Sequence, residues 1–312
     1  MVEALIAMAT LISGMALLIF SSNKVVDHSV KMGSILRMSP LLIGLLIVSL
    51  GTDLPEITNS IISSARGHGN INVGDSLGSV LVQISLILGI YPFLGGKLNI
   101  KRKEIIVIGA LEVATLMLAL WIVGSGHISR MSAALLVISW PVALLIARKI
   151  MKKEFAPVQY HYTPHGLHHH LLVIFMGFVG VAIASYVVVE SVITLSAALH
   201  IHEYIISFFL VAIGTSLPEL TVDLMAIRKK QYEIAIGDTI GSCIVDASFS
   251  IGIGPLFFPT AVSAGLAGTT GLYTLFVSIV ILSTLVIKQK IDRKVGAFFI
   301  LLYLFSYVLL YL

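Results

Sequence analysis

The chain has 312 residues, of which 57% are hydrophobic and 12% are charged, and its mean hydropathy is +1.02. A soluble domain carries about 25% charged residues, so this composition excludes a soluble globular protein and indicates an integral membrane protein. The formal net charge of +4 is small and gives no indication of a nucleic-acid partner.

Ten predominantly apolar stretches follow one another along the chain, each close to the ~20 residues that cross a bilayer as a helix. They cover residues 2–21, 32–50, 72–94, 104–123, 131–147, 168–190, 203–227, 233–258, 267–287 and 295–311, the second running on to about residue 65. The first stretch has no basic start, so we expect a retained span rather than a signal peptide. The chain is therefore predicted to be an all-α membrane protein with ten transmembrane helices.

Basic residues are concentrated in every second connection between these stretches. Eighteen of the 20 Lys and Arg lie beside or between stretches one and two, three and four, five and six, seven and eight, or nine and ten. Only Arg66 and Arg130 lie on the other side. The positive-inside rule assigns the basic connections, including the linker 151–170, to the cytoplasm and both termini to the outside. We expect a multi-pass protein of the cell membrane.

Two short motifs occur once in each half of the chain. Residues 51–57 are GTDLPEI and residues 214–220 are GTSLPEL; residues 74–79 are GDSLGS and residues 237–242 are GDTIGS. Both pairs are 163 positions apart. A constant shift across two motifs indicates a duplicated structural unit.

The duplication predicts two repeats of five helices, residues 1–150 and 171–312, joined by the linker 151–170. Because five is odd, the second repeat enters the membrane from the opposite side, an inverted arrangement typical of secondary transporters. Pro disrupts helical hydrogen bonding, so the Leu-Pro-Glu motifs predict interruptions in helices 2 and 7. We expect helices 3 and 8, which carry the other motif pair, to be interrupted as well. We expect these interruptions to meet at one ion site near the middle of the membrane.

The polar residues of the motifs favour a hard cation. A carboxylate in the middle of a membrane costs at least about 2.5 kcal/mol on insertion scales, so several together require counter-ions. Ser79 with Gln83, and Ser242 with Asp246, are spaced so that each pair lies on one helix face. The donors are all oxygen atoms, which favours calcium, with its flexible set of oxygen ligands, over magnesium, zinc or copper.

The two motif pairs resemble the α-repeats of the cation/calcium exchanger superfamily and are most similar to those of the sodium/calcium exchangers. The resemblance implies a secondary active antiporter that exchanges calcium for sodium by alternating access, with no enzymatic activity and no cofactor. Its partners would be calcium, sodium and the lipid bilayer, and it would function as a monomer. The ion-binding residues that we infer are Glu56, Glu219, Asp246, Gln83, Asp53, Thr52, Thr215, Ser216, Ser79 and Ser242.

Some positions depart from the common sodium/calcium pattern. Asp53 replaces a Ser, Gln83 replaces an Asn as in some calcium/proton exchangers, and Asp223 is an additional acid. The extra acids make protons an alternative counter-ion, so a calcium/proton exchanger remains a second hypothesis. Asp75 and Asp238 replace Asn in both halves. We interpret them as helix caps, with ion binding as the alternative.

Other polar residues have simpler interpretations. Glu112 and Glu190 are expected to be paired or interfacial, and Cys243 to be a packing residue. The segment 161–170, HYTPHGLHHH, is interpreted as a solvated linker, with a metal or proton sensor as the alternative.

Two other functional classes fit less well. A channel is disfavoured because several carboxylates at one buried site would release a cation slowly. An intramembrane aspartyl protease would use Asp75 and Asp238, but it leaves both Pro-Glu motifs unexplained.

Overall fold

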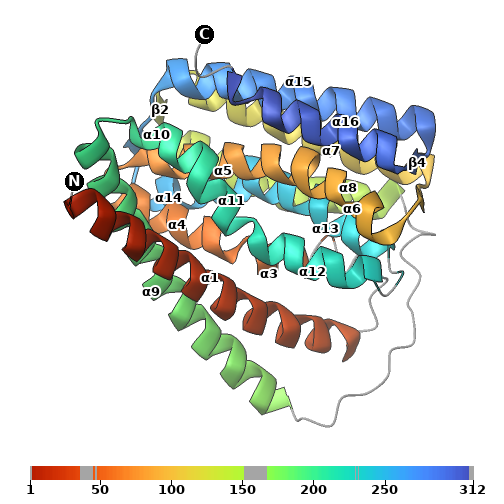
Figure 1. Ribbon diagram of the computed structural model, residues 1–312, viewed down its shortest axis with the longest axis horizontal. Helices are drawn as coiled ribbons and strands as arrows, with labels where there is room; N and C mark the ends of the chain where they lie inside the picture. The colour runs from red at the N-terminus through yellow and green to blue at the C-terminus, as the bar shows by residue number, and fades with distance from the viewer. Residues whose placement is uncertain are drawn as a thin grey trace.

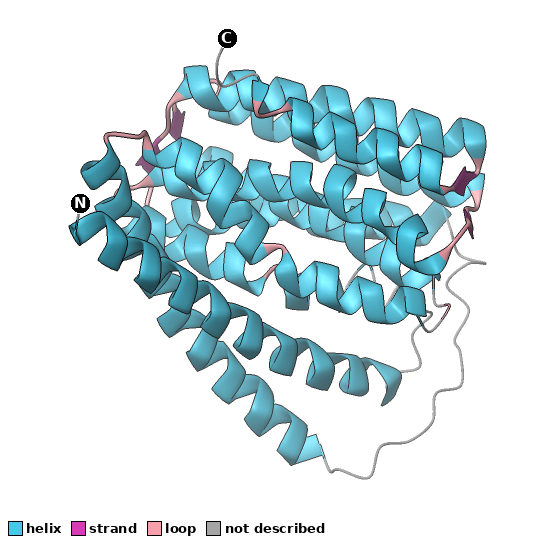
Figure 2. Cartoon of the chain, viewed as in Figure 1, coloured by secondary structure: helices cyan, strands magenta, loops and turns pink. Residues whose placement is uncertain are grey.

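A computed structural model describes residues 2–35, 45, 48–150, 167–228, 230 and 232–308 as a bundle of helices with two small strand pairs (Figures 1 and 2). The elements of the first half are α1 (Val2–Ile35), α3 (Ser49–Thr52), α4 (Leu54–Ala65), α5 (Gly69–Leu81), η2 (Val82–Ile87), α6 (Leu88–Gly95), β1 (Leu98–Asn99), α7 (Arg102–Val123), β2 (His127–Ile128) and α8 (Arg130–Ile150).

The elements of the second half follow in the same order. They are α9 (Leu167–Leu199), α10 (Glu203–Ile206), η3 (Ser207–Val211), α11 (Ala212–Thr215), α12 (Leu217–Arg228), α13 (Tyr232–Val245), η4 (Asp246–Ser250), α14 (Ile251–Phe257), β3 (Thr260–Ala261), α15 (Ala264–Lys288), β4 (Lys290–Ile291) and α16 (Arg293–Phe305). A shift of 163 positions carries α3 and α4 onto α11 and α12 residue for residue, and α5 begins where α13 begins. The spacing of the motifs in the sequence is therefore also the spacing of the structural elements.

The Leu-Pro-Glu motifs distort a helix without separating its two parts. Asp53 lies between α3 and α4 with φ −74° and ψ 4°, and Ser216 lies between α11 and α12 with φ −82° and ψ 5°. Helical bonds continue across both residues, from the Asp53 amide to the Ser49 carbonyl (2.9 Å) and from the Ser216 amide to the Ala212 carbonyl (3.1 Å). The following Pro has no N–H, so the interruption frees one carbonyl in each helix rather than opening a gap.

The second interruption in each half is π-helical. The segments η2 and η4 continue α5 and α13, and in each a serine hydroxyl, that of Ser85 or Ser248, donates to the carbonyl four residues earlier. In a π-helix the backbone N–H bonds the carbonyl five residues earlier, so the hydroxyl satisfies an acceptor that the backbone leaves free. These two serines are also 163 positions apart.

The two strand pairs join one half of the chain to the other. β1 pairs with β4 and β2 pairs with β3, both antiparallel, and the two pairs lie at opposite ends of the bundle (Figure 2). A shift of 163 carries β2 onto β4, and it carries β1 onto β3 with an offset of one residue. Exchanging the two halves therefore exchanges the two strand pairs, which is the pattern that a two-fold axis between the halves produces.

The helices that carry the motifs lie in the middle of the bundle (Figure 1). α5 packs so closely on η3 that a Cβ added at Gly78 would lie 2.2 Å from the Phe208 carbonyl oxygen. α1 and α9 pack side by side along one edge, and α7, α15 and α16 lie toward the opposite edge. The core is thus built from helices of both halves.

Eight helices of the described residues are long and apolar enough to cross a membrane. The other two of the ten expected spans fall partly outside the described residues, at 36–44 with 46–47 and at 309–312. α1 continues as helix to Ile35, beyond the predicted end at residue 21. Most of the histidine-containing segment, residues 161–166, lies outside the described residues, whereas His168 to His170 belong to the first turn of α9.

Candidate cation site

Three carboxylates from the two interrupted helices meet in the centre of the bundle. Asp53 lies at the junction of α3 and α4, Glu56 in the first turn of α4 and Glu219 in the first turn of α12. One carboxylate oxygen of each lies within 4.8 Å of those of the other two, and all three side chains are buried. The duplicated motif therefore brings acidic groups from both halves to one place.

Most oxygens of this cluster have no hydrogen-bond partner among the described residues. Both oxygens of Asp53, both of Glu219 and one of Glu56 are buried and unpaired. A buried charge without a partner costs several kcal/mol, and three adjacent carboxylates also repel one another. The cluster therefore has the chemistry of a site that holds cations.

Hydroxyl groups connect the cluster across the two halves. The Ser79 hydroxyl of α5 donates to Glu56 Oε1 (3.1 Å) and lies 3.4 Å from the Thr215 hydroxyl of α11. The Thr215 hydroxyl lies 2.9 Å from Asp75 Oδ1, to which it can donate. These contacts fix α5 of the first half against α11 of the second half at the level of the carboxylates.

Gln83 and Asp246 face each other from the two π-helical segments. The Gln83 amide donates to Asp246 Oδ2 (3.1 Å), and Asp246 Oδ1 has no partner among the described residues. The two residues are 163 positions apart, so each contacts its own equivalent. A residue can contact its equivalent only where a two-fold axis passes between them, so this pair marks the axis.

The remaining expected ligands are also buried near these helix junctions. The Thr52 hydroxyl donates to the carbonyls of Val48 (3.1 Å) and Ser49 (3.2 Å), which leaves its oxygen lone pairs free. The hydroxyls of Ser216 and Ser242 are buried without a partner among the described residues. All ten of the expected site residues are thus buried, and they come from equivalent elements of the two halves.

The interpretation of Asp75 and Asp238 as helix caps is wrong. α5 begins at Gly69 and α13 at Tyr232, so both aspartates lie in the second turn or beyond, inside a helix. Asp75 accepts hydrogen bonds from Asn59 and from Thr215. Asn59 was missed by the sequence analysis, although an Asn in an apolar helix is a detectable signal.

A second group of polar side chains joins α6 of the first half to α12 and α13 of the second half. The Tyr91 hydroxyl of α6 donates to Asp223 Oδ2 and also contacts the Thr239 hydroxyl, which lies 3.2 Å from the same carboxylate oxygen. All three side chains are buried. Of Tyr91, Asp223 and Thr239, only Asp223 could be identified from the sequence. Tyr91 is 132 positions away from Asp223, and no sequence motif connects the two residues.

The acids outside the motifs have partners, as expected. Glu112 accepts a hydrogen bond from Ser278 (2.8 Å), and Glu190 forms an ion pair with Arg66. Cys243 is buried with its Sγ 3.8 Å from the Val80 carbonyl oxygen, in agreement with a packing role.

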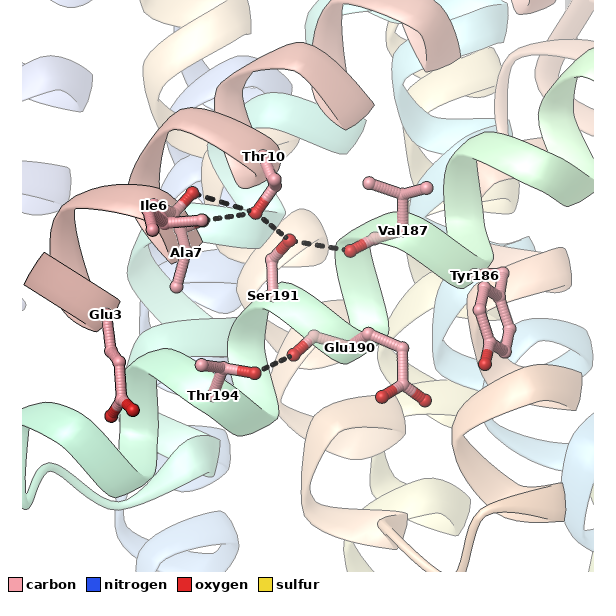
Figure 3. A pocket seen from close by; sticks show the side chains of 9 residues that line it. All are labelled: Glu3, Ile6, Ala7, Thr10, Tyr186, Val187, Glu190, Ser191 and Thr194. Carbon is pink, nitrogen blue, oxygen red and sulfur yellow. Dashed lines mark hydrogen bonds between the residues drawn. The ribbon is translucent and has the colours of Figure 1, made fainter.

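One pocket of about 300 Å³ lies between α1 and α9 (Figure 3). The hydroxyls of two of its lining residues, Thr10 and Ser191, lie 2.9 Å apart, and its nine lining residues include none of the expected ion ligands. This pocket is therefore distinct from the carboxylate cluster.

The comparison with known families matches the architecture. The model of the sodium/calcium exchanger protein family matches residues 6–149 and, a second time, residues 169–312. The chain belongs to the sodium/calcium exchanger family. Because each half matches the same model, the comparison supports the internal duplication of this chain.

Several relatives are similar over most of their length. The putative antiporter CaxA of Alkalimonas amylolytica is 28% identical over 276 residues, which are 85% of each chain. The uncharacterized membrane protein MJ0091 of Methanocaldococcus jannaschii is 27% identical over 299 residues, 94% of each chain. The sodium/calcium exchanger MaX1 of Methanosarcina acetivorans is 24% identical over 361 residues, covering 96% of this chain and 97% of that one.

Solved structures of the sodium-calcium exchanger NCX_Mj have the same fold. In one, from a crystal soaked with Na+ and Sr2+, the TM-score is 0.68 at 24% identity, and 98% of each chain is covered. Its membership of the exchanger family makes this chain a membrane transporter and not an enzyme. The aspartyl protease hypothesis is excluded by this assignment, and Asp75 is occupied by its contacts to Asn59 and Thr215.

Proposed function

We propose that this protein exchanges calcium for sodium across the membrane by alternating access. The observation that carries the proposal is the meeting of Asp53, Glu56 and Glu219, whose oxygens lie within 4.8 Å of one another and are mostly unpaired. Calcium takes 6 to 8 oxygen ligands in flexible geometry, and the surrounding carboxylate, hydroxyl and amide groups offer such ligands. The relatives named as exchangers and antiporters support the same reaction.

The proposed ligands form a central pair and a surrounding shell. Glu56 and Glu219 bind the cation directly, and Asp246, Gln83 and Asp53 complete the charged and amide ligands. The hydroxyl or carbonyl oxygens come from Thr52, Thr215, Ser216, Ser79 and Ser242. The carboxylates compensate the charge of either one calcium ion or several sodium ions, so occupation by one species excludes the other.

The proposed membrane arrangement has ten spans in two inverted repeats of five, residues 1–150 and 171–312. The position of the strand pairs supports it, since Lys97, Lys101 and Lys290 lie beside β1 and β4 at one end of the bundle. At the other end Arg130 follows β2. The loop that contains Arg66 precedes Gly69, and a Cβ added at Gly69 would contact β3. The basic end would face the cytoplasm together with the linker 151–170, and both termini would lie outside the cell.

A proton-coupled exchange is the second candidate, and Asp53 is the observation that favours it. The equivalent residue in the second half is Ser216, so Asp53 adds a third carboxylate to a site that the repeat alone would build with two. A third carboxylate can bind a proton in place of a cation. No cofactor is required for either reaction, and we propose that a single chain in the lipid bilayer is sufficient.

The test is a flux measurement on purified protein in proteoliposomes. Radioactive calcium uptake is measured with sodium, potassium and proton gradients imposed separately, and sodium-driven uptake is expected. Glu56→Gln and Glu219→Gln remove one central charge each and should abolish uptake while the protein remains folded in detergent. Normal uptake by either variant would contradict the proposed site, whereas uptake driven by a pH gradient alone would select the proton-coupled alternative.

A further inference from the structure

The polar cluster between α6, α12 and α13 contains two carboxylates with unpaired oxygens. Asp223 belongs to α12, Asp238 and Thr239 to α13, and Tyr91 to α6, and all four side chains are buried. The hydroxyls of Tyr91 and Thr239 both contact Oδ2 of Asp223, which leaves its Oδ1 free. Both oxygens of Asp238 are unpaired among the described residues, so three carboxylate oxygens have no partner.

Asp238 lies near both Asp223 and Glu219, and its carboxylate interacts electrostatically with each of them. Among the described residues, no ion pair joins Asp223 or Asp238 to a Lys or Arg.

The first half provides an internal comparison, because equivalent positions there are used differently. The equivalent of Asp223 is Ser60, whose hydroxyl accepts the Gly254 amide (3.1 Å), and Gly254 is the equivalent of Tyr91. The contact between Ser60 and Gly254 joins two helices by one neutral hydrogen bond. The equivalent contact between Asp223 and Tyr91 pairs a carboxylate with a phenol, and both side chains are buried.

The equivalent aspartates differ in the same way. In the first half Asp75 is held by the Asn59 amide and the Thr215 hydroxyl. In the second half Val222 stands at the position of Asn59, so Asp238 lacks the amide that holds its equivalent. A buried carboxylate with unpaired oxygens requires another source of positive charge.

The cluster lies between the central site and the end of the bundle that carries β1 and β4. Asp223 is one helical turn beyond Glu219 in α12, in the direction of Arg228. Near that end α6 packs on α12, since a Cβ at Gly95 would lie 2.4 Å from the Ile227 side chain. A cation moving between this end and the central carboxylates would meet Asp223 and Asp238 on that path.

We propose that Asp223 and Asp238, with the oxygens of Tyr91 and Thr239, bind a second hard divalent cation next to the central site. The inference rests on the proposed calcium transport and takes calcium as the ion. Two carboxylates match the charge of one divalent ion, and all available ligands are oxygens, as calcium requires. The two hydroxyls orient Asp223 so that its free Oδ1 can bind the ion together with Asp238. The second site binds a calcium ion before it enters the central site or after it has left it.

The experiment measures calcium binding to the purified full chain in detergent, without sodium, by equilibrium dialysis with radioactive calcium. The variant D223S introduces the residue that the first half has at the equivalent position. It is expected to lose one of two binding events, while the other keeps its affinity. The control E112Q changes an equally buried acid that lies in α7 and contacts Ser278, and it should keep both events.

A second variant keeps the proposal testable if D223S does not fold. Y91F retains the ring and both carboxylates but removes the hydroxyl that orients Asp223, so the affinity of the second event should fall without loss of the first. Equal calcium stoichiometry and equal affinities in the wild type and in the folded variants would overturn the second site. A wild-type protein that shows a single calcium-binding event, with the two aspartates sharing a proton, would overturn it as well. The proposed function is judged separately, by whether Glu56→Gln abolishes sodium-driven flux.

Discussion

The close contact between α5 and η3 predicts that Gly78→Ala damages both stability and transport. A Cβ at this position would lie 2.2 Å from the Phe208 carbonyl oxygen and 2.7 Å from the Ala212 Cβ. Ordinary van der Waals contact begins at 3.4 Å, so the backbones must separate by about 1.2 Å. Neither neighbour is the end of a flexible side chain, and overpacking of this kind costs about 1–3 kcal/mol.

The same displacement reaches the cation site, because Ser79 follows Gly78 in α5. Its hydroxyl lies 3.4 Å from Thr215 and 3.1 Å from Glu56, so a separation of about 1.2 Å breaks at least the first contact. The equivalent position is less crowded: a Cβ at Gly241 would lie 3.1 Å from the nearest atom and needs a shift of about 0.3 Å. We therefore expect Gly78→Ala to be clearly more harmful than Gly241→Ala.

The assay compares thermal unfolding midpoints in one detergent and calcium flux in proteoliposomes for the two variants. Gly268→Ala in α15 is the matched control, because no atom lies within 4 Å of the added Cβ and Ala has the higher helix propensity. The midpoint of Gly268→Ala should equal or exceed that of the wild type. A Gly78→Ala protein with normal midpoint and flux, or a Gly241→Ala protein that is the less stable of the two, would refute the packing argument.

Three further predictions use other parts of the structure. Asp53→Ser introduces the residue that the second half has at the equivalent position. Because protonation of Asp53 competes with cation binding, this variant should shift the acid inhibition of calcium transport to lower pH. An unchanged pH profile would show that Asp53 does not belong to the cation site. In a Cys243→Ser background, an impermeant thiol reagent should label Arg66→Cys but not Lys97→Cys in intact cells, and the opposite labelling would reverse the proposed topology. Asp292 caps α16 by accepting the amide of Val295 (3.1 Å), which holds the pKa of its carboxyl below 3.8. Because folding lowers this pKa, the cap stabilises the protein at any pH above 3.8 and loses its effect as the pH falls through the lowered pKa. The Asp292→Ala variant should therefore be less stable than the wild type at neutral pH, and the difference in stability should shrink in acid.

The sequence predicts the helical class, the limits of most helices and the convergence of the motif carboxylates. These features depend on apolar length, on Pro and Gly at fixed positions, and on the constant shift between the halves. The meeting of Glu56 and Glu219 follows from the duplication, since equivalent interruptions in a two-fold arrangement approach the same axis.

Other features depend on contacts that a single sequence does not encode locally. The two-residue strands are too short for an alternating pattern, and the π-helical segments differ from α-helix only in which carbonyl each amide contacts. Asp75 follows a Gly and was interpreted as a cap, but the helix begins six residues earlier at Gly69. Tyr91 contacts Asp223 only because α6 and α12 pack together.

The contact between Gln83 and Asp246 restricts how such a protein can arise. A pair of identical half-length chains related by a two-fold axis would place the same side chain on both sides of this contact. Two aspartates there would repel each other, and two glutamines would offer no charge to a cation. One copy can mutate without the other only when the two copies are encoded separately, as the halves of this polypeptide are, so the amide–carboxylate pair on the axis is an arrangement that two identical half-length chains cannot form.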